Sequence, residues 1–320
     1  MELRALRISR VNDEALAIRS YELIDPQGAP LPPFTAGAHI DLHLHDDCIR
    51  SYSLCNDPRE RHRYLIAVLR EAEGRGGSLF VHEKLTHGSS VLVSEPQNCF
   101  PLAGRASHHT LIAGGIGITP ILSMVRFLEA IGANYSLHYC ASDPQRAAFC
   151  SVLADPPFHK HTSMHFSHGD PRLRLDVASL LRLQMEGQNV YCCGPAGLIE
   201  AVNVATQAWS TGTVHFERFK SDPNSTIDRA LNSSFEIEIA STGQILIVPR
   251  EKSILRVLSE NGISHAYSCE EGICGTCAAG LLSGRADHRD SVLTQQERSA
   301  HNVLILCCSR AVSKRLRLDL

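Results

Sequence analysis

Four cysteines toward the C-terminus have a spacing that could hold iron and sulfide. Cys269, Cys274 and Cys277 lie in the segment C-E-E-G-I-C-G-T-C, and the doublet Cys307-Cys308 follows further on. The pattern C-x4-C-x2-C with a distant fourth cysteine is the plant-type arrangement of thiolates around a [2Fe–2S] cluster. Such a cluster carries one electron at a time, so the spacing predicts a one-electron carrier at this end of the chain.

The residues between these cysteines also suit a cluster. Backbone N–H groups must approach the sulfurs closely, and Gly272 and Gly275 lack the Cβ atoms that would prevent the approach. The alternative is a structural zinc site, but zinc knuckles usually present two close cysteine pairs. The spacing alone leaves Cys307 and Cys308 both open as the fourth ligand.

Two glycine-rich turns indicate a nucleotide site in the middle of the chain. The first is T-L-I-A-G-G-I-G-I-T-P, an apolar strand, a turn and a helix start, and it contains Gly114, Gly115, Gly117, Thr119 and Pro120. It departs from the Rossmann pattern G-x-G-x-x-G, so by itself a plain tight turn explains it equally well. The second is Y-C-C-G-P-A-G, which repeats the strand-to-turn pattern and contains Cys193, Gly194 and Pro195.

Two segments of the first third could bind a flavin phosphate and ring. In R-S-Y-S-L the arginine Arg50 can pair with phosphate and the ring of Tyr52 can cover a flat heterocycle, with Ser53 and Leu54 following. In R-G-G-S the residues Gly76, Gly77 and Ser78 open a short helix, whose free N–H groups suit the same phosphate. An ordinary strand and an ordinary helix start are the alternatives.

One carboxylate bears on the choice between NADH and NADPH. Asp143 follows the strand that ends Y-C-A-S-D-P. A carboxylate there accepts the ribose hydroxyls and repels a 2′-phosphate, so it favours NADH over NADPH. The alternative is that Asp143 only begins the D-P turn.

The elements that must position these residues change along the chain. Residues 1–103 alternate apolar and polar over short runs such as H-I-D-L-H-L-H, which predicts an antiparallel β-barrel. In 104–222, strands at 135–139, 163–167, 189–193 and 213–216 alternate with helices at 178–185 and 198–209, which predicts a parallel, doubly wound sheet. A polar linker is expected at 223–233. The last domain, 234–320, is predicted to contain a hairpin, one helix, the cysteine loop and a final strand V-L-I-L.

Composition narrows the class of protein. The chain has 320 residues, 43% of them apolar, and a net charge of −3, which argues against a nucleic-acid binder and against a disordered chain. No apolar run approaches the ~18 residues of a membrane span, and the charged N-terminus does not read as a signal peptide. The cysteines outside the cluster are not spaced as a disulfide framework, so a cytoplasmic location is expected.

The order of these signatures resembles the phthalate dioxygenase reductase-like family, which includes vanillate demethylase and carnitine monooxygenase reductase components. The resemblance rests on R-S-Y-S, R-G-G-S, the paired G-G-I-G-I-T-P and C-G-P turns, the cysteine loop, and the ending C-C-S-R-A. It implies an FMN barrel, a nicotinamide domain and a β-grasp ferredoxin domain. It also implies Cys307 as the fourth ligand, Cys193 beside the nicotinamide, and Glu217 and Phe219 near the flavin.

The function implied is that of an NADH-dependent oxidoreductase, namely the reductase component of a two-component Rieske-type oxygenase or demethylase. Electrons would pass from NADH through FMN and the [2Fe–2S] cluster to a separate oxygenase protein, with no nucleic acid or membrane involved. The chain has no C-x-H pair of the kind a Rieske centre needs, so oxygen chemistry is expected on the partner. Direct reduction of a small acceptor, or a redox sensor without turnover, are the alternatives.

Overall fold

The computed structural model describes residues 3–45, 48–104, 106–219, 233–267, 269–293 and 295–320. The chain divides into two compact units, Met1–Arg218 and Phe219–Leu320, and each is described by itself. The predicted linker at 223–233 lies, except for Ser233, outside the described residues. The predicted boundary at 103/104 falls inside the first unit.

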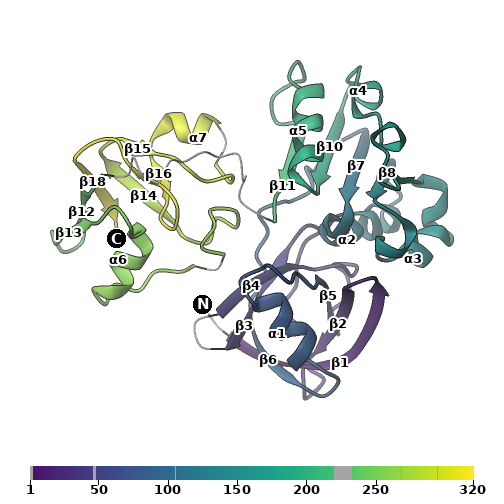
Figure 1. Cartoon of the computed structure of the whole chain (residues 1–320), viewed down its shortest axis with the longest axis horizontal. Coiled ribbons are helices and arrows are strands. Elements are labelled where there is room, and N and C mark those ends of the chain that lie inside the picture. Colours follow the sequence, from purple (N-terminus) through teal and green to yellow (C-terminus); the bar gives the residue numbers. More distant parts are fainter. Residues whose placement is uncertain (1–2, 46–47, 105, 220–232, 268, 294) are drawn as a thin grey trace. The chain divides into compact units, whose positions relative to one another are not determined.

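The first unit begins with an antiparallel sheet of six strands in the order β4-β3-β6-β1-β2-β5 (Figure 1). Alternate side chains such as Leu6 and Ile8 point into its core, as the period of two requires. A bridge between Leu54 and Ile66 joins the two edge strands, so the sheet closes into a barrel. The elements are β1 (Leu3–Ala15), β2 (Ile18–Ile24), β3 (His39–His45), β4 (Cys48–Ser53), β5 (Tyr64–Leu69), α1 (Gly77–Lys84) and β6 (Ser90–Ser94).

A parallel sheet of five strands follows in the order β11-β10-β7-β8-β9. The strand order reverses between β7 and β10, which is the point at which nucleotides bind in such sheets. The strands are β7 (His108–Gly114), β8 (Tyr135–Ala141), β9 (Thr162–Phe166), β10 (Gln188–Cys193) and β11 (Val214–Glu217).

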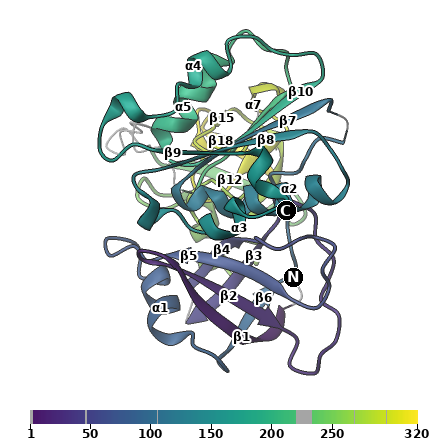
Figure 2. The same cartoon turned by 90° about the vertical axis from the view of Figure 1, so that its right-hand side faces the viewer.

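Helices cover both faces of this sheet (Figure 2). The core residues of α4 and α5 pack on one face, whereas α2 and α3 pack on the other. The α-helices are α2 (Ile118–Ala130), α3 (Cys150–Ala154), α4 (Val177–Leu180) and α5 (Ala196–Ala205), and the 3-10 helices are η1 (Gly115–Gly117), η2 (Pro144–Arg146), η3 (Phe158–His161) and η4 (Pro171–Leu173).

The helix predicted over 178–185 is wrong in its second half, because α4 ends at Leu180. Glutamine side chains hold the following turn in place of helical hydrogen bonds. The Met185 N–H donates to Gln188 Oε1 (3.0 Å), and the Ser210 N–H donates to Gln184 Oε1 (3.0 Å). Of the leucines and the methionine in this window, Leu181 is buried and Leu180 packs partly against the same core, whereas Leu183 and Met185 are exposed.

The second unit contains a mixed sheet of five strands in the order β13-β12-β18-β14-β16 and a small pair β15-β17. The predicted hairpin and helix are present, with Ser253 capping the helix by accepting from the Arg256 N–H. The predicted final strand V-L-I-L is an edge strand instead, and the last strand pairs parallel with β12 in the middle of the sheet. The elements are β12 (Phe235–Ile239), β13 (Ile245–Val248), α6 (Ile254–Glu260), β14 (Ala278–Ser283), β15 (Ala286–Asp287), α7 (Gln295–Ala300), β16 (Val303–Ile305), β17 (Arg310–Ala311) and β18 (Arg315–Asp319).

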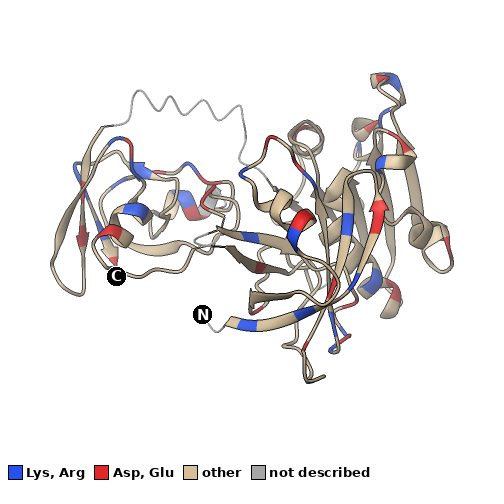
Figure 3. Cartoon of the chain, turned by 60° about the horizontal axis from the view of Figure 1, so that its bottom comes forward, with Lys and Arg blue, Asp and Glu red and all other residues tan. Residues whose placement is uncertain are grey.

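Charges on the surface are of both signs and are interspersed in both units (Figure 3). The basic residues near the C-terminus are paired across the sheet: Arg315 lies 2.7 Å from Glu236, and Arg317 lies 3.2 Å from Glu238. These two arginines are therefore paired with carboxylates on the neighbouring strand. In the described residues, no helix has the length and apolar character needed to cross a membrane.

Candidate functional site

Three of the four predicted cluster ligands lie in one tightly turned loop between α6 and β14. Cys269, Cys274 and Cys277 are all buried. The loop turns with positive φ at Gly272 (72°) and Gly275 (76°), a conformation that a glycine adopts without strain. The backbone N–H of Glu271 points at Cys269 Sγ, 3.3 Å away, which is the type of contact that stabilises a thiolate.

The fourth predicted ligand meets this loop from a distant part of the sequence. The thiol of Cys307 contacts Cys269 and Cys277. Hydrogen bonds from Cys274 and Cys307 lower the pKa of the Cys269 thiol, and the thiolate is the form that binds iron. Cys308 faces Gly272 instead, since a Cβ on that glycine would lie 2.5 Å from Cys308 Sγ. The geometry therefore favours Cys307 over Cys308.

The cysteine loop is supported by the segments on either side of the doublet. Arg310, from the C-C-S-R-A ending, donates to the carbonyls of Lys252 (2.8 Å) and Pro249 (3.0 Å) and lies over the ring of Phe235. The Ser291 N–H donates to the Gly272 carbonyl (2.9 Å). The contact of Ser291 ties the segment after β15 to the cysteine loop, whereas Arg310 holds the ends of β13 and of the turn before α6.

The donor set fits a two-iron cluster. Such a cluster takes two thiolates at each iron, so its ligands form two pairs. Within the described ranges, no group of three or more His, Cys, Asp and Glu side chains has the geometry to hold a metal ion.

The two glycine turns, which are far apart in sequence, touch each other at the carboxyl ends of β7 and β10. A Cβ on Gly114 would lie 2.6 Å from Pro195 Cδ, and a Cβ on Gly117 would overlap the carbonyl of Cys193. Both turns therefore require glycine for close approach. Thr119 and Pro120 lie in the first turn of α2, where the hydroxyl of Thr119 donates to the Ile116 carbonyl (3.0 Å).

Cys193 and Glu217 are neighbours at the same edge of this sheet. They are register partners on β10 and β11. Burial raises the pKa of the Cys193 thiol well above its usual range, so it is a neutral thiol and not a nucleophile. Burial also raises the pKa of Glu217 to about 8, and its Oε2 has no hydrogen-bond partner within the described part of the chain. Phe219 opens the second unit and is 37% exposed.

Asp143 comes two residues after the end of β8, a strand that pairs with β7 in the sheet. Its Oδ2 accepts from the Ser142 hydroxyl (3.0 Å) and lies 3.4 Å from Arg146 Nε. The carboxylate is part-exposed, so a ribose hydroxyl can reach it, although Arg146 offsets some of its charge.

The barrel brings Arg50 and Gly77 together. A Cβ on Gly77 would lie 2.6 Å from Arg50 Nε, and Arg50 Nη2 donates to the Arg75 carbonyl (3.1 Å). Gly76 precedes α1 with φ of 82°, and among the described residues no side chain caps the first turn of this helix. Its N–H groups and the guanidinium can therefore face one phosphate.

The remaining predicted flavin residues differ in what they expose. Burial raises the pKa of the Tyr52 phenol. Ser53 and Leu54 are buried, and Leu54 packs in the barrel core, so its backbone alone can contact a cofactor. Ser78 accepts the Glu71 N–H (3.1 Å), which fixes the approach to α1.

Sequence reasoning missed two buried polar residues at the junction of the barrel and α2. Asn56 and Ser123 are both wholly buried, and the Ser123 hydroxyl donates to the Asn56 carbonyl (2.9 Å). No spacing rule connects two residues so far apart in the chain. The available signal was that Asn56 directly follows the R-S-Y-S-L-C segment.

Comparison with known proteins finds relatives over nearly the whole chain. Residues 237–312 match the family model described as a 2Fe-2S iron-sulfur cluster binding domain. The chain is 45% identical to the tert-butanol monooxygenase / tert-amyl alcohol desaturase reductase subunit of Aquincola tertiaricarbonis, covering 98% of this chain and 95% of that one.

Solved structures of two kinds of protein are among those that match nearly the whole chain. One is phthalate dioxygenase reductase, described as a modular structure for electron transfer from pyridine nucleotides to [2Fe-2S]; it is 42% identical over 99% of this chain and 98% of its own, with a TM-score of 0.75. The other is an intact type IV self-sufficient cytochrome P450 monooxygenase, 36% identical over 99% of this chain and 41% of its own, with a TM-score of 0.89.

Proposed function

Because the chain belongs to the phthalate dioxygenase reductase-like family, we propose that it carries electrons from NADH, by way of FMN and a [2Fe–2S] cluster, to a Rieske-type oxygenase or demethylase. Family membership makes the chain an electron-transferring oxidoreductase with a 2Fe–2S domain. The observation that carries the finer proposal is that one chain holds two glycine turns in contact with each other and four neighbouring cysteines, three of them buried.

The residues of the first unit would bind and orient the two nucleotides. Gly114, Gly117 and Gly194 bring two turns into contact at the switch point of the sheet, where a dinucleotide would bind beside Cys193. Arg50 and the first turn of α1 would hold the FMN phosphate, and Tyr52 would cover the ring. FMN supplies the exchange between a two-electron hydride and single electrons.

NADH is preferred over NADPH in this proposal because Asp143 would accept the ribose hydroxyls and repel a 2′-phosphate. Cys193 and Glu217 would line the nicotinamide side of the site. Burial keeps both Cys193 and Glu217 neutral at pH 7. Neither side chain would therefore place a negative charge beside the nicotinamide ring.

Cys269, Cys274, Cys277 and Cys307 would hold the cluster in the second unit. The cluster supplies single-electron transfer to the outside. Burial of the first three thiols excludes water from the iron, and the surrounding loop offers backbone N–H groups to the sulfurs.

The partner would be a separate protein, because relatives of this chain are reductase subunits of oxygenases. A cytochrome P450 partner is the second candidate, since a chain of that kind contains a counterpart of this whole protein. All twelve cysteines are free thiols, which supports a location in the reducing cytoplasm.

One experiment tests the electron route. Purified protein is analysed for iron and flavin, and its visible spectrum is taken before and after anaerobic NADH. We expect bleaching of the flavin and the EPR signal of a reduced cluster. Cys277→Ser should abolish cytochrome c reduction while NADH still bleaches the flavin. Normal cytochrome c reduction by this variant, or zinc in place of iron, would refute the route.

Further arms separate the alternatives. Saturable NADH oxidation with a small physiological acceptor would favour a stand-alone enzyme, and absence of turnover with NADH and cytochrome c would favour a sensor. Oxygenase-dependent product formation with a Rieske protein, but not with a P450, would support the proposed partner class.

A further inference from the structure

We propose that Asn56 and Ser123 are positioning residues for hydride transfer, because they join the flavin-facing strand of the barrel to the helix that begins at the nucleotide turn. The inference rests on the proposed function. Asn56 follows the R-S-Y-S-L strand by two residues, and Ser123 lies in the second turn of α2. The hydrogen bond between them therefore connects the two nucleotide-binding segments directly.

The side chain of Asn56 fixes the end of the flavin strand. Its Oδ1 accepts the Leu65 N–H (3.0 Å), and its Nδ2 donates to the Arg63 carbonyl (3.1 Å). The amide thus replaces backbone pairing between the loop and β5 where the barrel closes. With its side chain satisfied in this way, the Asn56 carbonyl is left to accept the Ser123 hydroxyl (2.9 Å).

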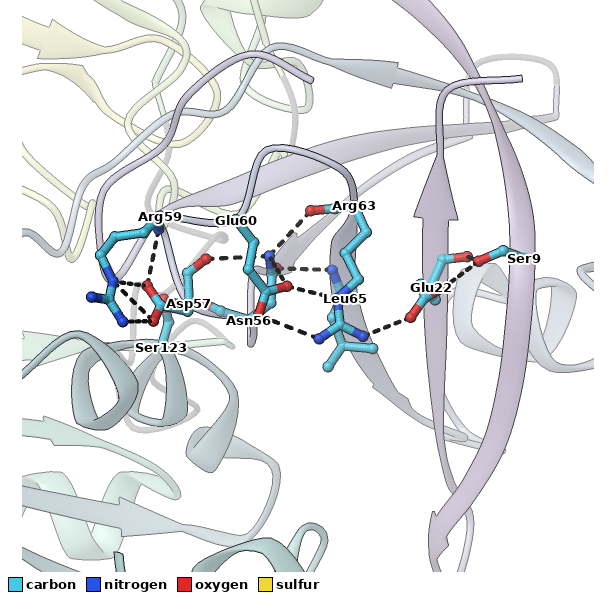
Figure 4. A network of polar contacts seen from close by, with 9 residues as sticks. All are labelled: Ser9, Glu22, Asn56, Asp57, Arg59, Glu60, Arg63, Leu65 and Ser123. Carbon is cyan, nitrogen blue, oxygen red and sulfur yellow. Dashed lines mark hydrogen bonds and ion pairs between the residues drawn. The ribbon is translucent and has the colours of Figure 1, made fainter. Parts of the chain in front are cut away.

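A network of charged and polar side chains holds the same loop (Figure 4). Arg63 lies 2.6 Å from both Glu60 and Glu22, and Glu22 accepts from Ser9 (2.7 Å). Because Arg63 bridges the loop and β2, the Asn56 carbonyl has a fixed direction. Loss of the Ser123 hydroxyl would leave that buried carbonyl without this hydrogen bond, which destabilises the junction.

Helix α2 transmits the position of this contact to the nucleotide turn. Every residue from Ile118 to Val125 is buried, because one side packs on the parallel sheet and the other on barrel residues such as Cys55 and Phe100. A Cβ on Gly37 of the barrel would lie 3.0 Å from Met124 Cε, so the barrel also touches α2 closely at the residue after Ser123. The first two turns of α2 are thus packed on both sides, and the first turn carries Thr119 and Pro120.

Hydride transfer is sensitive to this geometry. The reacting carbon and nitrogen must approach to about 3–3.5 Å, and a misplacement of about 1 Å can cost ~100-fold in rate. A small displacement of α2 against the barrel would therefore lower the rate of transfer while leaving each binding segment intact.

The test uses Ser123→Ala in the full-length holoprotein, because alanine suits a helix and removes a single hydroxyl. We expect the limiting rate of flavin reduction at saturating NADH, measured by anaerobic stopped flow, to fall about tenfold, with the apparent Kd for NADH within about twofold of wild type. Asn56→Ala should show the same split with a larger loss. In flavin-free protein, hydrogen exchange of the backbone over 115–123 should accelerate in both variants.

Ser94→Ala is the matched control, since Ser94 is a buried serine of β6 that donates to the Glu95 carbonyl (2.9 Å) away from the junction. An unchanged limiting rate in Ser123→Ala would overturn the proposal. So would an equal loss in Ser94→Ala, which would indicate a general effect of stability. If NADH did not reduce the wild-type protein, the proposed function would fail. The hydrogen-exchange measurement would still show whether Asn56 and Ser123 hold α2 against the barrel.

Discussion

At the scale of single residues, the doublet Cys307-Cys308 shows how a contact favours one of two candidates that spacing leaves open. Both residues lie in the turn that follows β16. Cys307 contacts two of the other sulfurs, whereas Cys308 faces Gly272. The two neighbouring side chains therefore reach different partners.

This contact predicts unequal effects of two alanine substitutions. Cys307→Ala should lose most of its iron and its visible cluster absorbance, while Cys308→Ala should retain about two irons per chain. Iron analysis of the purified proteins checks the outcome. Retention of the cluster in Cys307→Ala together with its loss in Cys308→Ala would reverse the assignment of the fourth ligand.

Glu217 gives a prediction about pH. Burial raises the pKa of its carboxyl to about 8, whereas the pKa of a glutamate in an unfolded chain is about 4.3. Between these values the folded chain holds a proton that the unfolded chain releases, so Glu217 lowers stability progressively as the pH rises from about 4.3 to about 8. Glu217→Gln removes this loss.

We therefore expect Glu217→Gln to raise the unfolding temperature over wild type by a margin that grows with pH, from about 1 kcal/mol of stability at pH 5 to about 4–5 kcal/mol at pH 8. Thermal unfolding across this range measures the difference. Glu200→Gln, which alters an exposed carboxylate of α5, is the control. A gap between Glu217→Gln and wild type that stays constant with pH would contradict the buried, neutral carboxyl.

At the scale of elements, the two glycine turns act as one structure. The strand order places β7 beside β10, and the glycines then allow the turn after β7 to touch the turn after β10. The local sequence predicts each turn, but it does not show whether one glycine turn contacts the other. The contact between the two turns follows from the strand order, which places β7 beside β10.

A methyl group inserted between the turns should damage nucleotide binding. Gly117→Ala would force the turn away from the Cys193 carbonyl, so we expect the apparent Kd for NADH to rise at least about tenfold. Gly197→Ala is the matched control, since its Cβ meets nothing within 4 Å and a helical alanine adds up to about 1 kcal/mol of stability. Equal NADH affinity in both variants would show that the close approach is unimportant.

The same scale explains which elements were predictable. Strands such as β2 and β3 follow from their period of two, and α6 from its serine cap and the glycine that follows it. The helix predicted over 178–185 is too long because two side-chain hydrogen bonds compete with helical ones. Each joins a residue of this segment to one beyond it: Met185 to Gln188, and Gln184 to Ser210. The position of the last strand was also missed, since pairing of β18 with β12 joins the two ends of the domain.

At the scale of the whole molecule, the chain separates its chemistry between two compact units. The barrel and the parallel sheet share core residues through α2, whereas the second unit has its own core. Unfolding should follow this division, with the barrel and the parallel sheet melting together.

Removal of iron tests the division. Structural clusters contribute to folding, so chelation should lower the unfolding temperature of the second unit and add an early transition to the far-UV circular dichroism melt. Fluorescence of the single tryptophan, Trp209, reports on the first unit, where it packs against the core under α4 and α5. Its transition should stay within about 2 °C of the holoprotein's, and an equal shift of both transitions would refute the independence of the units.

The sequence by itself determined the chemistry of the short segments: the thiolates of the cysteine loop, the guanidinium beside the aromatic in R-S-Y-S, and the glycines of each turn. Residues within one loop are held near each other by the covalent chain, so their types and spacing suffice. The tertiary structure alone decided which segments meet, as in Cys307 against Cys269, Gly114 against Pro195, and Ser123 against Asn56. Those contacts depend on strand order and on a core shared by distant residues, and no local pattern records either one.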